Sequence, residues 1–230
     1  VSLTYRYIGH ATHVFGINGA TVLVDPFFTS NPVTDVSADD VDANYILLTH
    51  GHFDHIEDTV AIAHRTGAKV IANFEIVNWL KAQGVPEEQT HPQHIGGGFH
   101  HEFGYLKLTI AFHGSSLPDG SYGGMPAGIL IDTKDDRRIY IAGDTSLFSD
   151  MQLYRGAELF IVPIGDNFTM GPDDALQAVK HVAPKDVVPC HYNTWAPIEQ
   201  NGKAWAERVA REVPDTNVHP LSPGGILELI

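Results

Sequence analysis

The chain has 230 residues, 43% of them hydrophobic, and a formal net charge of −14 at pH 7. This length can form one large core and no linker-like segment interrupts it, so we expect a single domain over residues 1–230. The acidic surface disfavours nucleic-acid partners. One cysteine, Cys190, excludes an intrachain disulfide, and no apolar run is long enough to span a bilayer. We therefore expect a cytoplasmic protein without a membrane partner.

The first part of the chain predicts antiparallel strands. Residues 3–8 form the first, and residues 14–17 and 20–24 form a hairpin around Asn18-Gly19. This dipeptide favours a two-residue hairpin turn because both residues tolerate positive φ angles.

Strands and helices then alternate. Strands are predicted over residues 45–49, 69–72, 105–112, 128–132, 138–142, 159–163, 186–189 and 226–229. Helices are predicted over residues 57–65, 74–83, 172–182 and 198–213. An antiparallel start followed by this alternation indicates layered, mixed α/β architecture.

Acidic residues and histidines recur where predicted strands end. Six such residues follow apolar stretches directly or closely: Asp25, His50, His113, Asp144, Asp166 and His191. Layered α/β proteins build their sites on loops at strand ends, so this recurrence predicts one site assembled from the whole chain.

Residues 49–56, THGHFDHI, hold the densest group of potential metal ligands. In an extended segment His50 and His52 point to the same side, and Asp54 and His55 follow where a helix begins. A first metal ion can bind His50 and His52, and a second can bind Asp54 and His55. Imidazole and carboxylate ligands suit zinc, and also manganese, iron or nickel.

The motif H-x-H-x-D-H, followed by a lone histidine, a Gly-Asp-Thr aspartate and a late histidine, resembles the metallo-β-lactamase superfamily. Further stretches resemble its small prokaryotic family described only as metal-dependent hydrolases: Tyr7-Ile-Gly-His10, Leu23-Val-Asp-Pro26, residues 122–128, Ala142-Gly-Asp-Thr145, residues 163–172 and His191-Tyr-Asn-Thr194. The resemblance runs from near Tyr5 to the C-terminus. It implies a four-layer αββα sandwich with the site at one edge.

The same resemblance implies two divalent metal ions, most simply zinc. His50, His52 and His113 would hold the first ion, and Asp54, His55 and His191 the second. Asp144 would bridge the two, leaving room for a shared hydroxide and a substrate oxygen.

Four further residues besides His10 are candidates for roles around the metals. His10 is expected to contact substrate or protonate a leaving group, against the alternative of a structural histidine. Asp25 is expected to orient a ligating imidazole, with a turn role as alternative. Asp166, Asn167 and Asn193 are expected to line the pocket or to tie down their own loops. Residues 114–128, with five glycines, are expected to form a mobile loop over the site.

The expected function is hydrolysis of a small ester-type substrate by metal-bound hydroxide, with Asp54 orienting that hydroxide and accepting its proton. A phosphodiester is the first expectation, because two metals stabilise a phosphorane-like transition state. A lactone or other carboxylic ester is the alternative. A non-catalytic metal-binding or scaffold protein is the alternative from another class. Small-molecule substrates are the expected partners, and a homo-oligomer is compatible with the sequence.

Overall fold

Two seven-stranded mixed sheets face one another in the computed structural model, which describes residues 3–229. The first sheet has the order β14 (Ile226–Leu229), β1 (Leu3–Gly9), β2 (Thr12–Ile17), β3 (Ala20–Val24), β4 (Tyr45–Leu47), β5 (Lys69–Ala72) and β6 (Thr90–Pro92). The second has the order β13 (Asn217–Val218), β12 (Asp186–Cys190), β11 (Leu159–Pro163), β10 (Arg138–Ile141), β9 (Ala127–Thr133), β8 (Gly104–Ile110) and β7 (Gly98–His101).

Each sheet combines an antiparallel half with a parallel half. In the first sheet β14, β1, β2 and β3 are antiparallel neighbours, and β3 to β6 are parallel. In the second sheet β7 to β10 are antiparallel, and β10 to β13 are parallel. The predicted combination of an antiparallel start with later alternation is confirmed.

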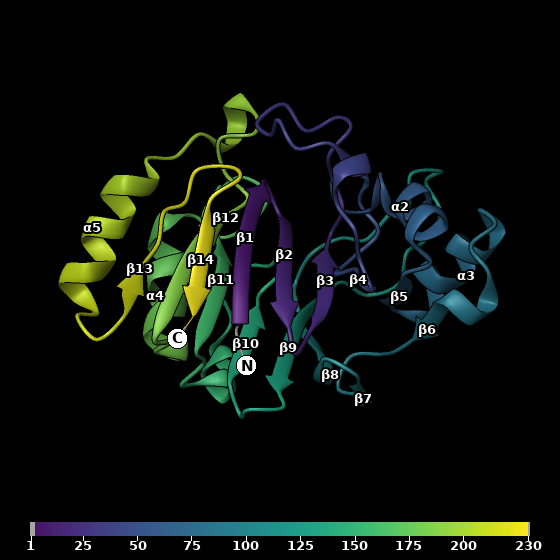
Figure 1. Ribbon diagram of the computed structural model, residues 1–230. Coiled ribbons are helices and arrows are strands. Elements are labelled where there is room, and N and C mark those ends of the chain that lie inside the picture. Colours follow the sequence, from purple (N-terminus) through teal and green to yellow (C-terminus); the bar gives the residue numbers. More distant parts are fainter. Residues whose placement is uncertain (1–2, 230) are drawn as a thin grey trace.

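Helices cover both outer faces, so the molecule has the four layers of an αββα sandwich (Figure 1). The helices are α1 (Phe53–Ile56), α2 (Thr59–Thr66), α3 (Phe74–Ala82), α4 (Pro172–Val182) and α5 (Gly202–Glu212). Short 3-10 helices occupy Ala38–Asp40, Glu87–Gln89, Ser149–Tyr154 and Ala196–Ile198.

Three apolar clusters fill the spaces between these layers. The central cluster joins the two sheets and includes Phe15 and Ile161. The second joins the first sheet to α1, α2 and α3, and the third joins the second sheet to α4 and α5. Burial of apolar area on both faces of each sheet supplies the main driving force for this arrangement.

Local sequence signals account for several element ends. Asn18 and Gly19 adopt φ angles of 52° and 84°, as the predicted hairpin turn requires. The Asn73 side chain caps α3 by accepting a hydrogen bond from the Ile76 amide. Pro172 opens α4 at its first turn, as predicted.

The prediction of one helix over residues 57–65 is wrong in its start, because the chain forms α1, a break, and then α2. Asp58 lies at the break, where its carboxylate accepts hydrogen bonds from the Phe28 and Thr29 amides instead of capping α2. The last helix begins at Gly202 rather than at residue 198, and the Asn201 side chain caps it.

Three edge strands were not predicted: β6, β7 and β13. All are short, with two to four residues, and β6 and β7 contain histidine, glycine and proline rather than an apolar run. Pairing with a neighbouring strand, and not local propensity, makes them strands.

No helix in the described residues is long and apolar enough to cross a membrane.

The site-bearing edge is formed by sharp turns directly after strands. His10, Asp25 and His191 follow β1, β3 and β12 and have φ angles of 57°, 47° and 53°. These left-handed conformations are uncommon for residues other than glycine and recur at functional sites. These three residues are therefore held in sharp turns where β1, β3 and β12 end.

His13 provides a test of stability against pH. It lies buried on β2, with Nδ1 3.0 Å from the Tyr5 hydroxyl. Burial, reinforced by nearby His55 and His10, lowers the pKa of His13 to about 3. An unfolded chain protonates this residue near pH 6.5. The folded protein then binds fewer protons, so its stability falls as the pH drops from about 6.5 toward 3, by up to about 1.4 kcal/mol per pH unit.

Urea unfolding of the chelator-treated protein at pH 6 and pH 5 measures this effect. Wild type is expected to lose about 1 kcal/mol more than the His13→Asn variant over that interval, because other titrating groups are common to both. Equal losses in the two proteins would show that His13 does not titrate as described.

Candidate metal centre

Six of the seven predicted metal ligands lie in two adjacent groups at one edge of the sandwich. In one group the ligand atoms of His50, His52 and His113 all lie within 4.8 Å of one another. In the other, ligand atoms of His10, Asp54, His55 and His191 meet the same limit. The residues of each group come from distant strand ends, which converge because the two sheets share this edge.

Asp144 lies between the two groups. Its Oδ2 atom faces four imidazole Nε2 atoms, at 3.0 Å from His191, 3.4 Å from His55, 3.4 Å from His113 and 3.9 Å from His50. Gly143, with φ of 65°, makes this position reachable, since a Cβ atom there would lie 2.7 Å from the Ala127 carbonyl. One carboxylate can therefore interact with cations in both groups.

Asp25 organises two of the histidines from behind. Its Oδ2 atom lies 2.8 Å from His55 Nδ1 and accepts a 2.6 Å hydrogen bond from the Thr49 hydroxyl. The Thr49 oxygen lies in turn 3.0 Å from His50 Nδ1. The Asp25 carboxylate accepts a hydrogen bond from His55 Nδ1. The Thr49 hydroxyl donates its proton to Asp25, so its oxygen accepts a hydrogen bond from His50 Nδ1. Both imidazoles therefore carry a proton on Nδ1 and direct Nε2 toward the cluster.

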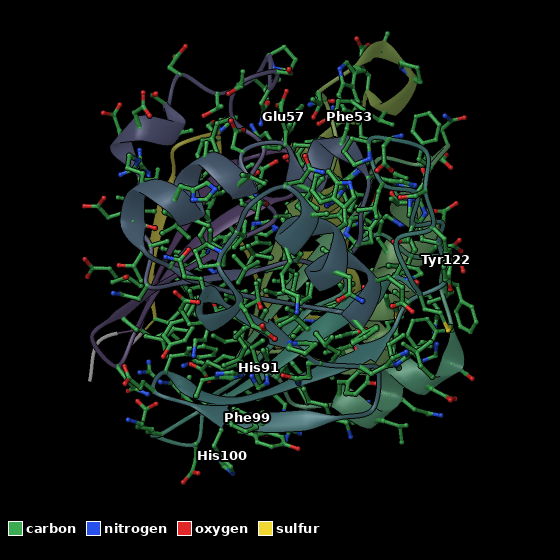
Figure 2. All side chains as sticks on the ribbon, turned by 90° about the vertical axis from the view of Figure 1, so that its right-hand side faces the viewer. Phe53, Glu57, His91, Phe99, His100 and Tyr122 are labelled. Carbon is green, nitrogen blue, oxygen red and sulfur yellow. The ribbon has the colours of Figure 1, made fainter. Side chains whose placement is uncertain are left out.

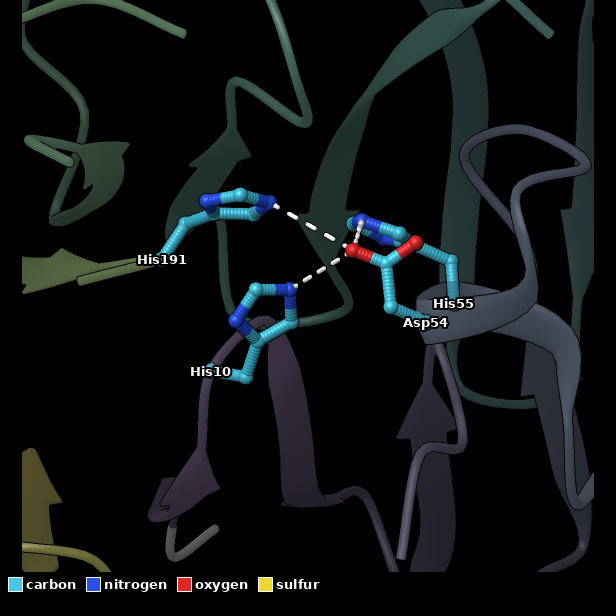
Figure 3. Close-up of side chains that lie close together, drawn as sticks. All are labelled: His10, Asp54, His55 and His191. Atoms are coloured by element: carbon cyan, nitrogen blue, oxygen red, sulfur yellow. Dashed lines mark hydrogen bonds and ion pairs between the residues drawn. The ribbon is translucent and has the colours of Figure 1, made fainter. Parts of the chain in front are cut away.

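His10 approaches the site through Asp54 (Figure 3). His10 Nε2 lies 3.0 Å from Asp54 Oδ2, and His10 Nδ1 lies 2.7 Å from the Thr194 hydroxyl. Burial, with the neighbouring His191, lowers the pKa of His10 to about 3, so its ring is neutral at pH 7. The ring is fully buried, does not line the cavity and contacts Asp54 and Thr194, while its role toward a substrate stays a prediction.

The buried carboxylates of the cluster favour nearby positive charge. Burial tends to raise the pKa of Asp144, but facing His191 and His55 outweigh it and hold this pKa well below its usual value. Burial tends to lower the pKa of His55, yet Asp144, Asp54 and Asp25 raise it well above the usual value. Without another positive charge, the buried carboxylates therefore recruit a proton onto His55.

The donor set fits divalent metal ions. His55 Nε2 and His191 Nε2 are buried and, although they face the Asp144 carboxylate, make no well-aligned hydrogen bond within the described chain. Orphaned imidazole nitrogens next to ionised carboxylates are the environment that zinc and similar cations occupy. Bound cations would replace the proton on His55 and satisfy these nitrogens together.

A cavity of about 650 Å³ opens above these side chains. Its floor includes His52, Asp54, His113, Asp144 and His191. Its walls are largely apolar and were not predicted as functional; they consist of Phe53, Leu117, Pro118, Phe168, Trp195 and Pro197, with Ser116. Phe53 lies inside the histidine motif, and Trp195 comes four residues after His191. Their closeness in sequence to candidate ligands is the signal that could have predicted them as wall residues.

Three predicted pocket residues face elsewhere. The Asp166 side chain accepts a hydrogen bond from the Asn167 amide, and both residues are exposed in a tight turn. Asn193 accepts from the Gln200 amide and also closes a local turn. None of the three lines the cavity, so the loop-tying alternative describes them. Local hydrogen bonds of the Asp166 and Asn193 side chains accompany these positions outside the cavity.

The segment over residues 114–128 is tied to its surroundings. Ser115 accepts a hydrogen bond from the Gly51 amide and donates one to the Gly123 carbonyl. The Asn73 amide donates to Gly123 and Met125. These bonds connect the segment to its surroundings beside the cavity, and its expected mobility stays a prediction. Cys190 is buried in the central cluster.

The sequence and the structure of the chain are similar to those of known proteins. A family model described as the β-lactamase superfamily domain matches residues 20–192. The chain belongs to the metallo-β-lactamase superfamily. Within it, a metal-dependent hydrolase of Bacillus cytotoxicus is 51% identical over 211 residues, covering 88% of this chain and 91% of the relative. One from Thermus thermophilus is 45% identical over 226 residues, covering 97% and 98%.

Solved structures agree with this membership. The metallo hydrolase Igni18 from Ignicoccus hospitalis has a TM-score of 0.90 and 30% identity, covering 100% of this chain and 99% of that one. The predicted fold class and the identification as a metal-dependent hydrolase are therefore confirmed.

Proposed function

We propose that this hydrolase binds two divalent cations, zinc first among them, and cleaves a small ester whose reacting group is a phosphodiester. The observation that carries the proposal is the pair of ligand groups flanking Asp144. His50, His52 and His113 would hold one cation, and Asp54, His55 and His191 the other. When bound, such cations make water nucleophilic near neutral pH and stabilise negative charge that develops on the substrate.

The chain supplies position and proton acceptance around the cations. Asp54 lines the cavity and its carboxylate is held by His10, which is held in turn by Thr194. His55 and His10 hold the pKa of Asp54 below its usual value against the opposing effect of burial, so this carboxylate stays ionised and can only accept hydrogen bonds. Asp54 is the group placed to orient the attacking water and to receive its proton.

A carboxylic ester or lactone is the second candidate, favoured by a specific observation. The cavity walls include no lysine or arginine among the described residues, so the chain itself offers no cation to a remote phosphate. A non-catalytic scaffold is disfavoured because all seven predicted ligands come together beneath an open cavity.

Metal analysis paired with hydrolysis assays tests the proposal. We expect about two metal ions per chain by mass spectrometry and turnover of bis(4-nitrophenyl) phosphate that chelators abolish and zinc restores. His52→Ala should remove metal from one ligand group and abolish most activity, since His52 lies at the half-exposed rim, where its loss leaves the core intact.

Phe99→Ser is the matched control, because Phe99 is an exposed residue on β7 and lies at the opposite end of the molecule from Phe53 in Figure 2. Its activity should equal that of wild type. A protein that binds no metal after reconstitution would contradict the whole proposal. Turnover of a simple lactone alone would replace the phosphodiester with a carboxylic ester.

A further inference from the structure

Exposed aromatic side chains gather at the cavity above the candidate ligands. Phe53 and Phe168 are 51% and 56% exposed. Phe53 and Trp195 rings lie with centroids 6.2 Å apart, and Phe27 packs behind both, at 5.8 Å and 6.1 Å. Single exposed apolar residues are ordinary, but a group of them around one concave site indicates binding.

The walls and the floor of this cavity differ sharply in chemistry. The floor holds the histidines and carboxylates proposed to bind metal. The walls present aromatic rings, Leu117 and two prolines, with the Ser116 hydroxyl as their polar group. No charged side chain other than the candidate ligands lines the cavity within residues 3–229. A charged substituent on a substrate would lose its hydration here without gaining a partner.

We propose that the Phe53–Phe168–Trp195 wall is a subsite for an uncharged, apolar substituent of the substrate, such as an aryl or branched alkyl group. This inference rests on the proposed function, because the ester group would react at the metal ligands below. The net charge of −14 points the same way, since it repels substrates with additional anionic groups. The subsite selects against nucleotides and sugar phosphates and in favour of small apolar esters.

The shape of the cavity fits a small molecule better than a protein segment. A volume of about 650 Å³ lies within the range of small-molecule sites. The three aromatic residues come from the start of α1, the loop before α4 and the start of the 3-10 helix Ala196–Ile198. The same cavity is lined by the candidate ligands, so an occupant reaches the reacting centre. Trp195 also packs against His10, with centroids 4.9 Å apart, which joins the wall to the residues that hold Asp54.

Calorimetric binding of two metal-chelating inhibitors tests this inference without turnover. Acetohydroxamate and benzohydroxamate share the metal-binding head and differ only in a methyl or phenyl group. We expect zinc-loaded wild type to bind benzohydroxamate at least about tenfold more tightly, as burial of the additional apolar carbons predicts. Phe168→Ser should reduce this preference to about threefold or less, since Phe168 is exposed on a loop and its loss spares the core.

Phe99→Ser serves again as control and should keep the full preference, because it removes an equally exposed phenylalanine away from the cavity. The metal content of each sample is measured alongside. Equal affinity for both inhibitors in metal-loaded wild type would overturn the apolar subsite and leave the metal centre standing. A preference unchanged in Phe168→Ser would also overturn it. A chain that retains no metal would overturn the proposed function, and the inference with it.

Discussion

Replacing Asp144 with asparagine is expected to lower kcat/KM by about 10³-fold. The substitution keeps the size of the side chain but removes the charge that faces His191, His55 and His113 at 3.0–3.4 Å. Stabilisation of transition-state charge by bound cations is worth several kcal/mol, and each 1.4 kcal/mol is a factor of ten in rate. Steady-state kinetics on the best ester substrate and metal content by mass spectrometry measure the loss.

Asp186→Asn is the matched control for this experiment. Asp186 is nearly as buried as Asp144 and also faces a histidine, His219, at 2.7 Å, but it lies at the opposite end of its strand from the site. It should retain its metal and its activity within about threefold, as expected for a site that does not touch the chemistry. If Asp144→Asn kept both metal and rate, Asp144 would not link the two ligand groups.

Replacing Asp25 with asparagine is expected to weaken metal binding by about 10–100-fold, although Asp25 would not touch the metal. The introduced amide could still accept one hydrogen bond from Thr49, but this neutral side chain would no longer fix the Nδ1 proton of His55. Both ligand groups should lose metal affinity, because Asp25 contacts His55 directly and His50 through Thr49. Competition with a chromogenic chelator gives the affinity of each metal site.

Thr49→Val separates the two arms of this network. It removes only the hydroxyl between Asp25 and His50, so the group of His50, His52 and His113 should lose affinity while the other group keeps it. Two sites weakened equally by Thr49→Val, or neither site weakened by Asp25→Asn, would show that these contacts do not orient the imidazoles.

Many of the candidate ligands could be predicted from short stretches of the sequence. His50, His52, Asp54 and His55 fall within six positions, and Asp144 and His191 each follow a strongly apolar strand. Such signals are local because strand ends and helix starts depend mainly on nearby residues. The hairpin at Asn18-Gly19 and the start of α4 at Pro172 were predictable for the same reason.

Other features depended on contacts between distant parts of the chain. His10 meets Thr194 across 184 residues, and this contact places a conspicuous histidine behind Asp54 rather than in the cavity. Asn193 likewise meets the Gln200 amide, and neither Asp166 nor Asn193 lines the cavity. The edge strands β6, β7 and β13 exist only because a neighbouring strand pairs with them.

The sequence by itself determined which residues have the chemistry of metal ligands and that they follow strands in a layered α/β fold. Only the tertiary structure decided which carboxylate orients which imidazole, and that aromatic side chains wall the cavity. The physical reason is that ligand chemistry belongs to single residues, whereas direction and exposure of a side chain depend on the backbone turn and on neighbours far away in the chain.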